Sequence, residues 1–244
     1  MKKLPKWAKP TIIITLFVIT LTILLFGRTL YDFSKTNVLA TSEIIPNIYA
    51  KKTGSVNCFL IRGEEGYIMV DTGSNIVQTE KALSELGIMP EQITAILLTH
   101  SDSDHVAAVS LFTNADVYLS ESEVQLIDGT TRRFWWGNNS LDREFTTIND
   151  NEVLQIAGYE ILCIAVPGHT PGSMSFLFNN EYLFVGDAMG LINGKAGLFI
   201  NVFNMDEEAQ ATSISKLAAV DAQYIFTSHH GYSDNLVFVF DEWE

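Results

Sequence analysis

The chain has 244 residues and a formal net charge of −14, from 29 acidic and 15 basic residues. Residues 1–28 hold five basic residues and no acidic one, so the rest of the chain sets ten basic against 29 acidic residues, a charge of −19. A surface of that sign repels phosphate backbones and anionic lipid, which argues against a nucleic-acid partner. The roughly 200 residues beyond the N-terminal part suffice for one substantial core and no second domain.

Residues 1–28 form a distinct segment in which lysines precede an uncharged apolar run. The run from Pro10 to Gly27 is nearly all Ile, Leu, Val, Phe and Thr. At about 1.5 Å per residue it gives a helix of roughly 27 Å, close to the thickness of a bilayer's hydrocarbon core. The lysines before it predict a single-pass cell-membrane helix with a cytoplasmic N-terminus and an extracytoplasmic domain. A cleaved signal peptide is the alternative, although Ala40, the small residue of a cleavage site, lies well beyond the apolar run.

Residues 29–42 are polar and patternless, which predicts a tether, and the domain is predicted to occupy residues 43–244. Apolar runs bounded by turn residues predict strands, and apolar spacing close to 3.6 residues predicts helices. The predicted strands are 44–49, 56–62, 67–71, 94–99, 116–119, 152–156, 159–166, 173–178, 182–185 and 224–227. The predicted helices are 76–86, 104–112, 120–127 and 206–220, the last with Asp206 as its N-cap.

Four potential metal ligands directly follow the predicted strand 94–99. They are His100, Asp102, Asp104 and His105, in a chain with only five histidines. A polar loop with Asp104 as a helix N-cap would account for that aspartate alone and would leave both histidines without a role. His100 stands at the carboxyl end of a strand, where open α/β sheets bind ligands. The stretch therefore predicts one half of a metal site.

The other half is predicted at three later strand ends. His169 lies in the Pro- and Gly-rich loop 167–172, Asp187 follows a strand, and His229 and His230 follow the strand 224–227. All five histidines thus stand at strand ends, which is unexpected for structural histidines. Two divalent ions can share a bridging carboxylate and hydroxide. The donors divide into His100, Asp102 and His169 for one ion and Asp104, His105 and a C-terminal histidine for the other, with Asp187 as the bridge.

Five motifs occur in an order that resembles the metallo-β-lactamase superfamily of hydrolases, over residues 43–232. They are Asp71-Thr72-Gly73, Thr99-His100-x-x-x-Asp104-His105, the Pro-Gly-His-Thr-Pro-Gly-Ser run 167–173, Gly186-Asp187 and a terminal histidine. The resemblance implies an α/β fold, an αββα sandwich of two mixed β-sheets flanked by helices, here preceded by one N-terminal transmembrane helix. It also implies that His100 and His169 bind a first metal, Asp104 and His105 a second, and Asp187 both. Asp71 matches a residue that supports the ligands without binding the metal.

The terminal ligand is either His229 or His230. Alignment of Ser228-His229 with the family's Gly-His favours His229, because a small residue before the ligand permits a close approach. The pair His230-Gly231 favours His230 instead. The histidine that is not a ligand is expected in the rim of the pocket.

Asp102 departs from the family pattern, which most often has a histidine at that place. The resemblance implies two divalent ions, with zinc expected first. Aspartate is harder and charged, so manganese or iron are the alternatives at the first position. A weak first position, with only one ion bound, also remains open.

The resemblance implies a metal-dependent hydrolase in which a metal-activated hydroxide attacks an ester, thioester, lactone or amide of a small molecule. Asp104 is the candidate catalytic residue, because a ligand carboxylate beside the bridging water could take up its proton. The loop around His169 is similar to that of the glyoxalase II-like branch, but the predicted extracytoplasmic location argues against a glutathione thioester. The alternative is a membrane-anchored binding or regulatory domain of the same fold with weakened or lost catalysis, for which Asp102 is the argument.

Residues 129–140 interrupt the pattern of strands and helices. Arg132 and Arg133 stand there beside Phe134, Trp135 and Trp136. One interpretation is a lid that grips an anionic or aromatic substrate. The other is that the aromatic side chains pack over a helix or lie against the membrane surface.

Overall fold

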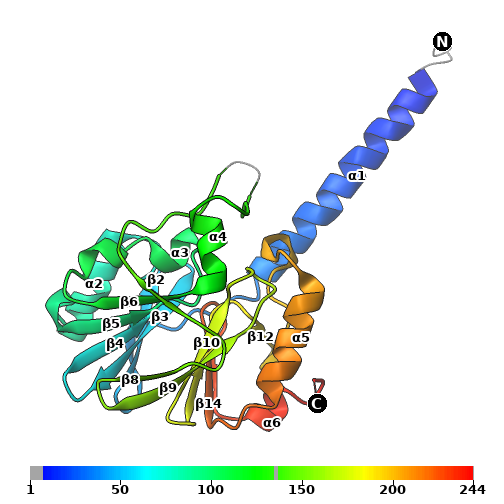
Figure 1. Cartoon of the computed structure of the whole chain (residues 1–244). Helices are drawn as coiled ribbons and strands as arrows, with labels where there is room; N and C mark the ends of the chain where they lie inside the picture. The colour runs from blue at the N-terminus through cyan, green and yellow to red at the C-terminus, as the bar shows by residue number, and fades with distance from the viewer. Residues whose placement is uncertain (1–7, 135–136, 244) are drawn as a thin grey trace. The chain divides into compact units, whose positions relative to one another are not determined.

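The structure, a computed structural model, describes residues 8–134 and 137–243 (Figure 1). The chain divides after Thr36 into a small N-terminal unit and a larger second unit. The first unit contains α1 (Ala8–Phe33) and the turn that follows it. Among the described residues, α1 is the one helix long and apolar enough to cross a membrane, a property that N-terminal signal sequences share.

The boundary between the two units differs from the predicted tether at 29–42. Residues 29–33 continue α1. The chain joins the second unit as early as Asn37, whose N–H donates to the carbonyl of His229 at 2.8 Å. The N–H of Leu39 donates to Asn57 Oδ1 at 2.7 Å. The connection is shorter than predicted because these backbone groups pair with the domain rather than with water.

The second unit is built on two mixed β-sheets. The first has the order β1-β2-β3-β4-β5-β6-β7, antiparallel as far as β4 and parallel from β4 to β7. Its strands are β1 (Ser42–Ile45), β2 (Ile48–Thr53), β3 (Val56–Gly63), β4 (Gly66–Val70), β5 (Ile93–Leu97), β6 (Asp116–Ser120) and β7 (Thr146–Ile148). The second has the order β15-β14-β11-β10-β9-β8, in which β11 and β14 are parallel and the other pairs antiparallel. Its strands are β8 (Val153–Ile156), β9 (Tyr159–Ala165), β10 (Met174–Phe178), β11 (Tyr182–Phe184), β14 (Tyr224–Thr227) and β15 (Gly231–Ser233), and β12 (Gly190–Ile192) pairs with β13 (Lys195–Gly197) in a separate hairpin.

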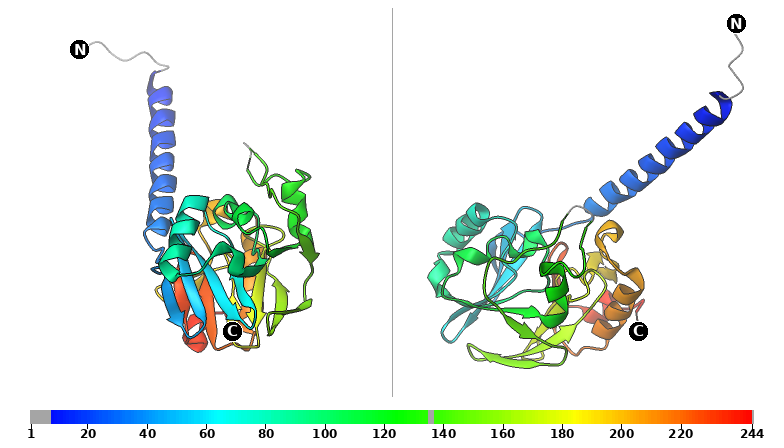
Figure 2. Two further views of the ribbon diagram at one scale, coloured as in Figure 1. Left: turned by 90° about the vertical axis from the view of Figure 1, so that its left-hand side faces the viewer. Right: turned by 45° about the horizontal axis from the view of Figure 1, so that its top comes forward.

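Helices cover the outer face of each sheet, and Figure 2 shows the layers from two further directions. Side chains alternate along β3, so Phe59 packs between the sheets while Leu60 packs outward with Leu83 of α2 (Ile76–Leu86). On the other outer face, Leu217 of α5 (Glu207–Ala218) packs with Ile225. The predicted αββα sandwich is confirmed, and so is Asp206 as N-cap, which accepts from the N–H of Ala209.

The predicted helices 104–112 and 120–127 are much shorter than expected. The first is α3 (Ser103–Val106) with a 3₁₀ turn at Val109–Leu111, and the second is a 3₁₀ turn followed by α4 (Val124–Ile127). A longer α3 would need the carbonyl of His105 as an intrahelical acceptor. That carbonyl instead accepts from the N–H groups of Thr72 and Gly73, at 2.6 and 3.2 Å. The Asp71-Thr72-Gly73 turn thus ends α3, and the N-cap position belongs to Asp102 rather than Asp104.

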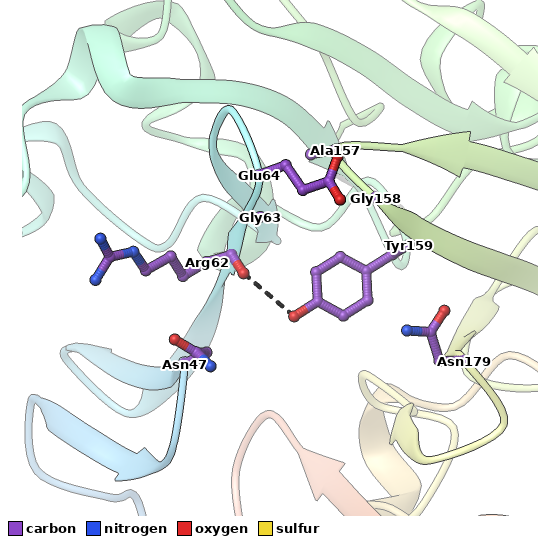
Figure 3. A pocket seen from close by; sticks show the side chains of 8 residues that line it. All are labelled: Asn47, Arg62, Gly63, Glu64, Ala157, Gly158, Tyr159 and Asn179. Carbon is purple, nitrogen blue, oxygen red and sulfur yellow. Dashed lines mark hydrogen bonds between the residues drawn. The ribbon is translucent and has the colours of Figure 1, made fainter.

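Strand ends from both sheets bring the predicted ligands to one edge of the sandwich. β4 leads into Asp71, β5 into the segment at His100, β11 into Asp187 and β14 into His229. A hollow of about 390 Å³ lies between the turns 63–66 and 157–158, where the hydroxyl of Tyr159 donates to a carbonyl at 3.2 Å (Figure 3). The turn 63–66 precedes β4 and Asp71 follows it, so the hollow is remote from the ligands.

The other short helix of the described chain is α6 (Leu236–Val239), near the C-terminus.

Candidate metal centre

Asp104, His105, Asp187 and His229 surround a common point, here called the second position. His105 Nε2 lies 3.5 Å from Asp187 Oδ2 and 3.8 Å from Asp104 Oδ2. His229 Nε2 lies 3.4 Å from Asp187 Oδ2 and 3.6 Å from Asp104 Oδ2. Donors held tetrahedrally at about 2.0–2.1 Å from an ion are roughly 3.4 Å apart, so these distances fit a divalent ion.

His100, Asp102 and His169 form a neighbouring group, here called the first position. Asp102 Oδ2 lies 3.7 Å from His100 Nε2 and 3.2 Å from His169 Nε2. Asp187 connects the two positions, because its Oδ2 is also 3.6 Å from His169 Nε2. The structure therefore brings together all seven of the predicted ligands.

Several of these inward-facing atoms have no hydrogen-bond partner. Among the described residues, the Nε2 atoms of His100, His105 and His229 and the Oδ1 atom of Asp187 are buried and unpartnered. A buried polar atom without a partner costs about 1–3 kcal/mol, and native proteins rarely contain several in one place. Three of these four atoms, those of His105, Asp187 and His229, lie at the second position, so the donor set there fits a metal centre.

Each of the four clustered histidines has its other ring nitrogen occupied. Nδ1 of His105 lies 2.8 Å from Asp71 Oδ2, and Nδ1 of His229 lies 2.7 Å from the carbonyl of Ser55. Nδ1 of His100 lies 3.0 Å from Thr99 Oγ1, and Nδ1 of His169 lies 3.3 Å from Asn204 Oδ1. An acceptor beside Nδ1 holds the proton there and leaves Nε2 free to bind a metal, which is the usual arrangement of histidine ligands.

The carboxylates create a negative potential at the second position. Burial alone would lower the pKa of His105, but Asp187 and Asp104 outweigh it and raise that pKa well above its ordinary value. The same balance raises the pKa of His229. Conversely, burial would raise the pKa of Asp187, but the charges of His229 and His105 hold it well below its ordinary value. These opposite shifts are what a cation-binding site produces.

Arg133 reaches the first position from the loop that follows α4. Its Nε donates to Asp102 Oδ1 at 2.8 Å, and its Nη2 donates to Asp102 Oδ2 at 2.7 Å and lies 3.1 Å from His169 Nε2. Burial would raise the pKa of Asp102, but the neighbouring His169 and His100 and the guanidinium of Arg133 hold it well below its ordinary value. The sequence placed Arg133 in a candidate lid; the structure makes it the partner of a predicted ligand.

Glu123 is a buried carboxylate that the sequence did not single out. It joins two ligand-bearing loops, because Oε1 accepts from the N–H and hydroxyl of Ser101 at 2.8 and 2.6 Å. Oε2 accepts from the hydroxyl of Thr170 at 2.7 Å and the N–H of Gly172 at 3.1 Å. Burial raises the pKa of Glu123 although these donors favour its ionised form. One acidic residue in a predicted helix carried no signal of this role.

Phe199 is a second residue that the sequence did not indicate. Its ring centroid lies 5.1 Å from that of His169 and 5.2 Å from that of His229. It therefore packs against a histidine of each position, from the segment that follows β13. An isolated phenylalanine in a glycine-rich loop gives no periodic signal by which to find it.

His230 does not join the cluster. Its ring is buried and faces Gly190, where a Cβ would lie 2.9 Å from the ring's Cε1. Of the two candidate ligands, the structure thus brings His229 alone to the second position. Trp135 and Trp136 of the proposed lid lie outside the described residues.

Comparison with known proteins identifies the family that the sequence motifs resemble. The sequence profile of the Metallo-beta-lactamase superfamily matches residues 52–229. "Probable metallo-hydrolase MJ0296" of Methanocaldococcus jannaschii is 30% identical over 174 residues, which cover 70% of this chain and 75% of that protein. A "Probable polyketide biosynthesis zinc-dependent hydrolase", PksB of Bacillus subtilis, is 30% identical over 137 residues, 54% of each chain. A "Hydroxyacylglutathione hydrolase" of Glaesserella parasuis is 29% identical over 150 residues, 59% of this chain and 54% of that protein.

Solved structures share the fold. The metallo-beta-lactamase family protein TTHA1429 of Thermus thermophilus aligns with a TM-score of 0.63 and 22% identity, covering 82% of this chain and 79% of that one. A B3 metallo-beta-lactamase described as having an active-site glutamic acid aligns with a TM-score of 0.66 and 18% identity, covering 88% and 91%. The profile match spans most of the chain, and the motifs, the sandwich and the donor cluster agree with it. The chain is therefore a metallo-hydrolase that belongs to the metallo-β-lactamase superfamily.

Proposed function

We propose that this metallo-hydrolase is anchored in the cell membrane by α1 and cleaves an ester, thioester, lactone or amide bond of a small molecule outside the cytoplasm. The observation that carries the hydrolytic part is the second position, where four donors with metal-like spacing include two buried, unpartnered imidazole nitrogens. A divalent ion held there, zinc first and manganese or iron as alternatives, would supply a Lewis acid and lower the pKa of a water molecule towards neutrality.

The chain's own residues divide the work by their exposure. The side chains of His105, Asp187 and His229 are at most 8% exposed and are suited to hold the ion rigidly. The side chain of Asp104 is 40% exposed, so it alone among the four donors reaches the open face of the site. Asp104 is therefore the residue proposed to take up the proton of the attacking water as well as to bind the metal.

The proposed class of bond is supported by two relatives that are described as hydrolases. One relative is described as a hydroxyacylglutathione hydrolase and another as a polyketide biosynthesis zinc-dependent hydrolase. Each match spans only about half of that protein, so neither substrate transfers directly to this chain. The bond that this chain cleaves is therefore assigned by class, as an ester, thioester, lactone or amide.

The membrane assignment is supported by α1 and by its flanking charge. Four lysines precede the apolar run, whereas Arg28 and Lys35 are the basic residues that closely follow it, and this asymmetry favours a cytoplasmic N-terminus and an outward-facing domain. Protease treatment of intact cells should remove the domain and spare an N-terminal tag. Recovery of a soluble chain that lacks residues 1–40 would show cleavage instead of anchoring.

A turnover screen of the full chain tests the hydrolase proposal. Ester, thioester, lactone and β-lactam substrates are offered before and after chelation, and zinc, manganese and iron are then restored separately. We expect turnover that chelation abolishes and one metal restores, and a loss of at least about 100-fold in Asp104→Asn. Asp116→Asn, a change of the same kind at an exposed strand residue, is the control. Turnover that survives both chelation and Asp104→Asn would contradict the proposal, and a bound ion without turnover would favour a binding role.

A further inference from the structure

Arg133 is a buried part of the first position rather than a surface residue near it. Its side chain is 1% exposed, against 14% for the Asp102 side chain that it contacts. Both oxygens of Asp102 accept from the guanidinium, in the forked geometry that makes such pairs strong. Asn139, from the same loop, donates to Asp102 Oδ1 at 2.9 Å and to Ser101 Oγ at 2.8 Å. The loop thus delivers a fixed positive charge to the carboxylate that replaces the family's histidine.

His169 can bind either Arg133 or a metal ion, but not both. Its Nδ1 faces Asn204 Oδ1, and the amide of Asn204 is oriented by Gln210, which donates to that Oδ1 at 3.1 Å and accepts from Asn204 Nδ2 at 2.7 Å. The ring proton is therefore on Nδ1, and Nε2 has a single lone pair. That lone pair faces Arg133 Nη2 at 3.1 Å. A donor hydrogen and a metal ion would compete for it.

The distances leave little separation between the guanidinium and an ion at the first position. Arg133 Nη2 lies 2.7 Å from Asp102 Oδ2 and 3.1 Å from His169 Nε2, and those two atoms are 3.2 Å apart. An ion bound to both of them at about 2.1 Å would therefore lie within roughly 4 Å of Nη2, on whichever side it sat. A divalent cation and a guanidinium repel one another at that separation, in a site where burial weakens solvent screening.

We infer that this chain carries one resident divalent ion, at the second position, and that the guanidinium of Arg133 takes the place of the ion at the first. The inference rests on the proposed metal-dependent function and deepens it. Asp102 is then the anchor of Arg133 and not a metal ligand. The exchange of histidine for aspartate is explained, because a neutral imidazole could not form the forked pair with a guanidinium.

Metal counting on the full chain in detergent micelles tests this inference. The protein is stripped with a chelator, reloaded with excess zinc, freed of loose zinc by gel filtration, and its zinc-to-protein ratio is measured. Wild type should hold one equivalent. Arg133→Met removes the competing charge and exposes donors whose spacing is already metal-like, so it should hold two. Arg132→Met, at the exposed neighbouring arginine, should stay at one.

A second pair of variants does not depend on how Arg133→Met folds. His169→Ala should keep one equivalent of zinc, because His169 belongs to the first position, whereas His229→Ala should lose it. Titration with cobalt should show the same contrast. The d–d absorption should saturate at one equivalent in His169→Ala and should fail to develop in His229→Ala. Equal losses in the two variants would overturn the inference, and so would one equivalent in folded Arg133→Met.

The zinc content of wild type separates the role of Arg133 from metal-dependent hydrolysis itself. Two equivalents in wild type would overturn the role of Arg133 and leave metal-dependent hydrolysis standing. No zinc in wild type under conditions that load an authentic zinc hydrolase would contradict both.

Discussion

Asp71 lies 2.8 Å from Nδ1 of His105, and its carboxylate also accepts from the N–H and hydroxyl of Thr99, both at 2.8 Å. Its backbone is left-handed, with φ of 59°, a conformation that aspartate and asparagine tolerate better than most residues. One buried carboxylate therefore links the end of β4, the end of β5 and a predicted metal ligand. It holds the proton of His105 on Nδ1, so that Nε2 faces the second position.

Asp71→Asn should lower metal affinity about 10- to 100-fold with little change in fold. Asparagine tolerates the left-handed backbone and its oxygen can still accept from Thr99. Its NH₂ group then faces His105 Nδ1, which drives the proton to Nε2 and blocks coordination. Competition with a chromogenic zinc chelator measures the change. Asp221→Asn, at an exposed aspartate, is the control, and an affinity equal to wild type in Asp71→Asn would contradict the role given to Asp71.

Glu123→Leu should cost about 3 kcal/mol of unfolding free energy, because it leaves two backbone N–H groups and two hydroxyls without their acceptor in the interior. Glu121→Leu, two residues earlier on the exposed side, should change stability by less than about 0.5 kcal/mol. Urea unfolding followed by tryptophan fluorescence compares the two. Similar stabilities would mean that the loops at Ser101 and Thr170 do not depend on Glu123.

Removal of the metal should destabilise the second unit. An ion that binds only the folded chain adds about 3–4 kcal/mol when its free concentration is 100 to 1,000 times its dissociation constant. Chelation should therefore lower the thermal midpoint of wild type. His229→Ala, which loses a donor, should begin with a low midpoint and respond little to chelator. A wild-type midpoint that chelator leaves unchanged would contradict a tightly held ion.

The gathering of the candidate ligands at one edge of the sandwich could be predicted, because each candidate lies in a segment after a strand that its apolar run reveals. Runs such as 182–185 and 224–227 are bounded by polar or glycine residues, and parallel strands carry their carboxyl ends to one edge of a sheet. The choice of His229 over His230 needed coordinates, because both follow β14. One ring turns to the second position and its neighbour faces Gly190.

The role of Arg133 and the lengths of α3 and α4 could not be predicted from the sequence, because both depend on tertiary contacts. Arg133 is 31 residues from Asp102 in an irregular loop, and no periodicity marks which of two adjacent arginines turns inward. α3 ends early because the Asp71-Thr72-Gly73 turn takes the carbonyl of His105, a contact across 33 residues. Local propensity carries no information about such partners.

His230 should make the folded chain lose stability in mild acid. Burial, with the neighbouring charge of His229 in second place, lowers the pKa of His230 from its ordinary value of 6.5 to about 4. Between those values the unfolded chain binds a proton that the folded chain does not, so stability is present above pH 6.5 and is lost as pH falls towards 4. At pH 4.5 the loss from this group should be about 2.5 kcal/mol. Urea unfolding of wild type and His230→Gln is measured at pH 7.5 and 4.5, with chelator present so that metal release contributes to neither. The loss of unfolding free energy between the two pH values in wild type, minus the same loss in His230→Gln, is the contribution of His230. An equal drop in both proteins would show that His230 is protonated as readily in the folded chain as in the unfolded one.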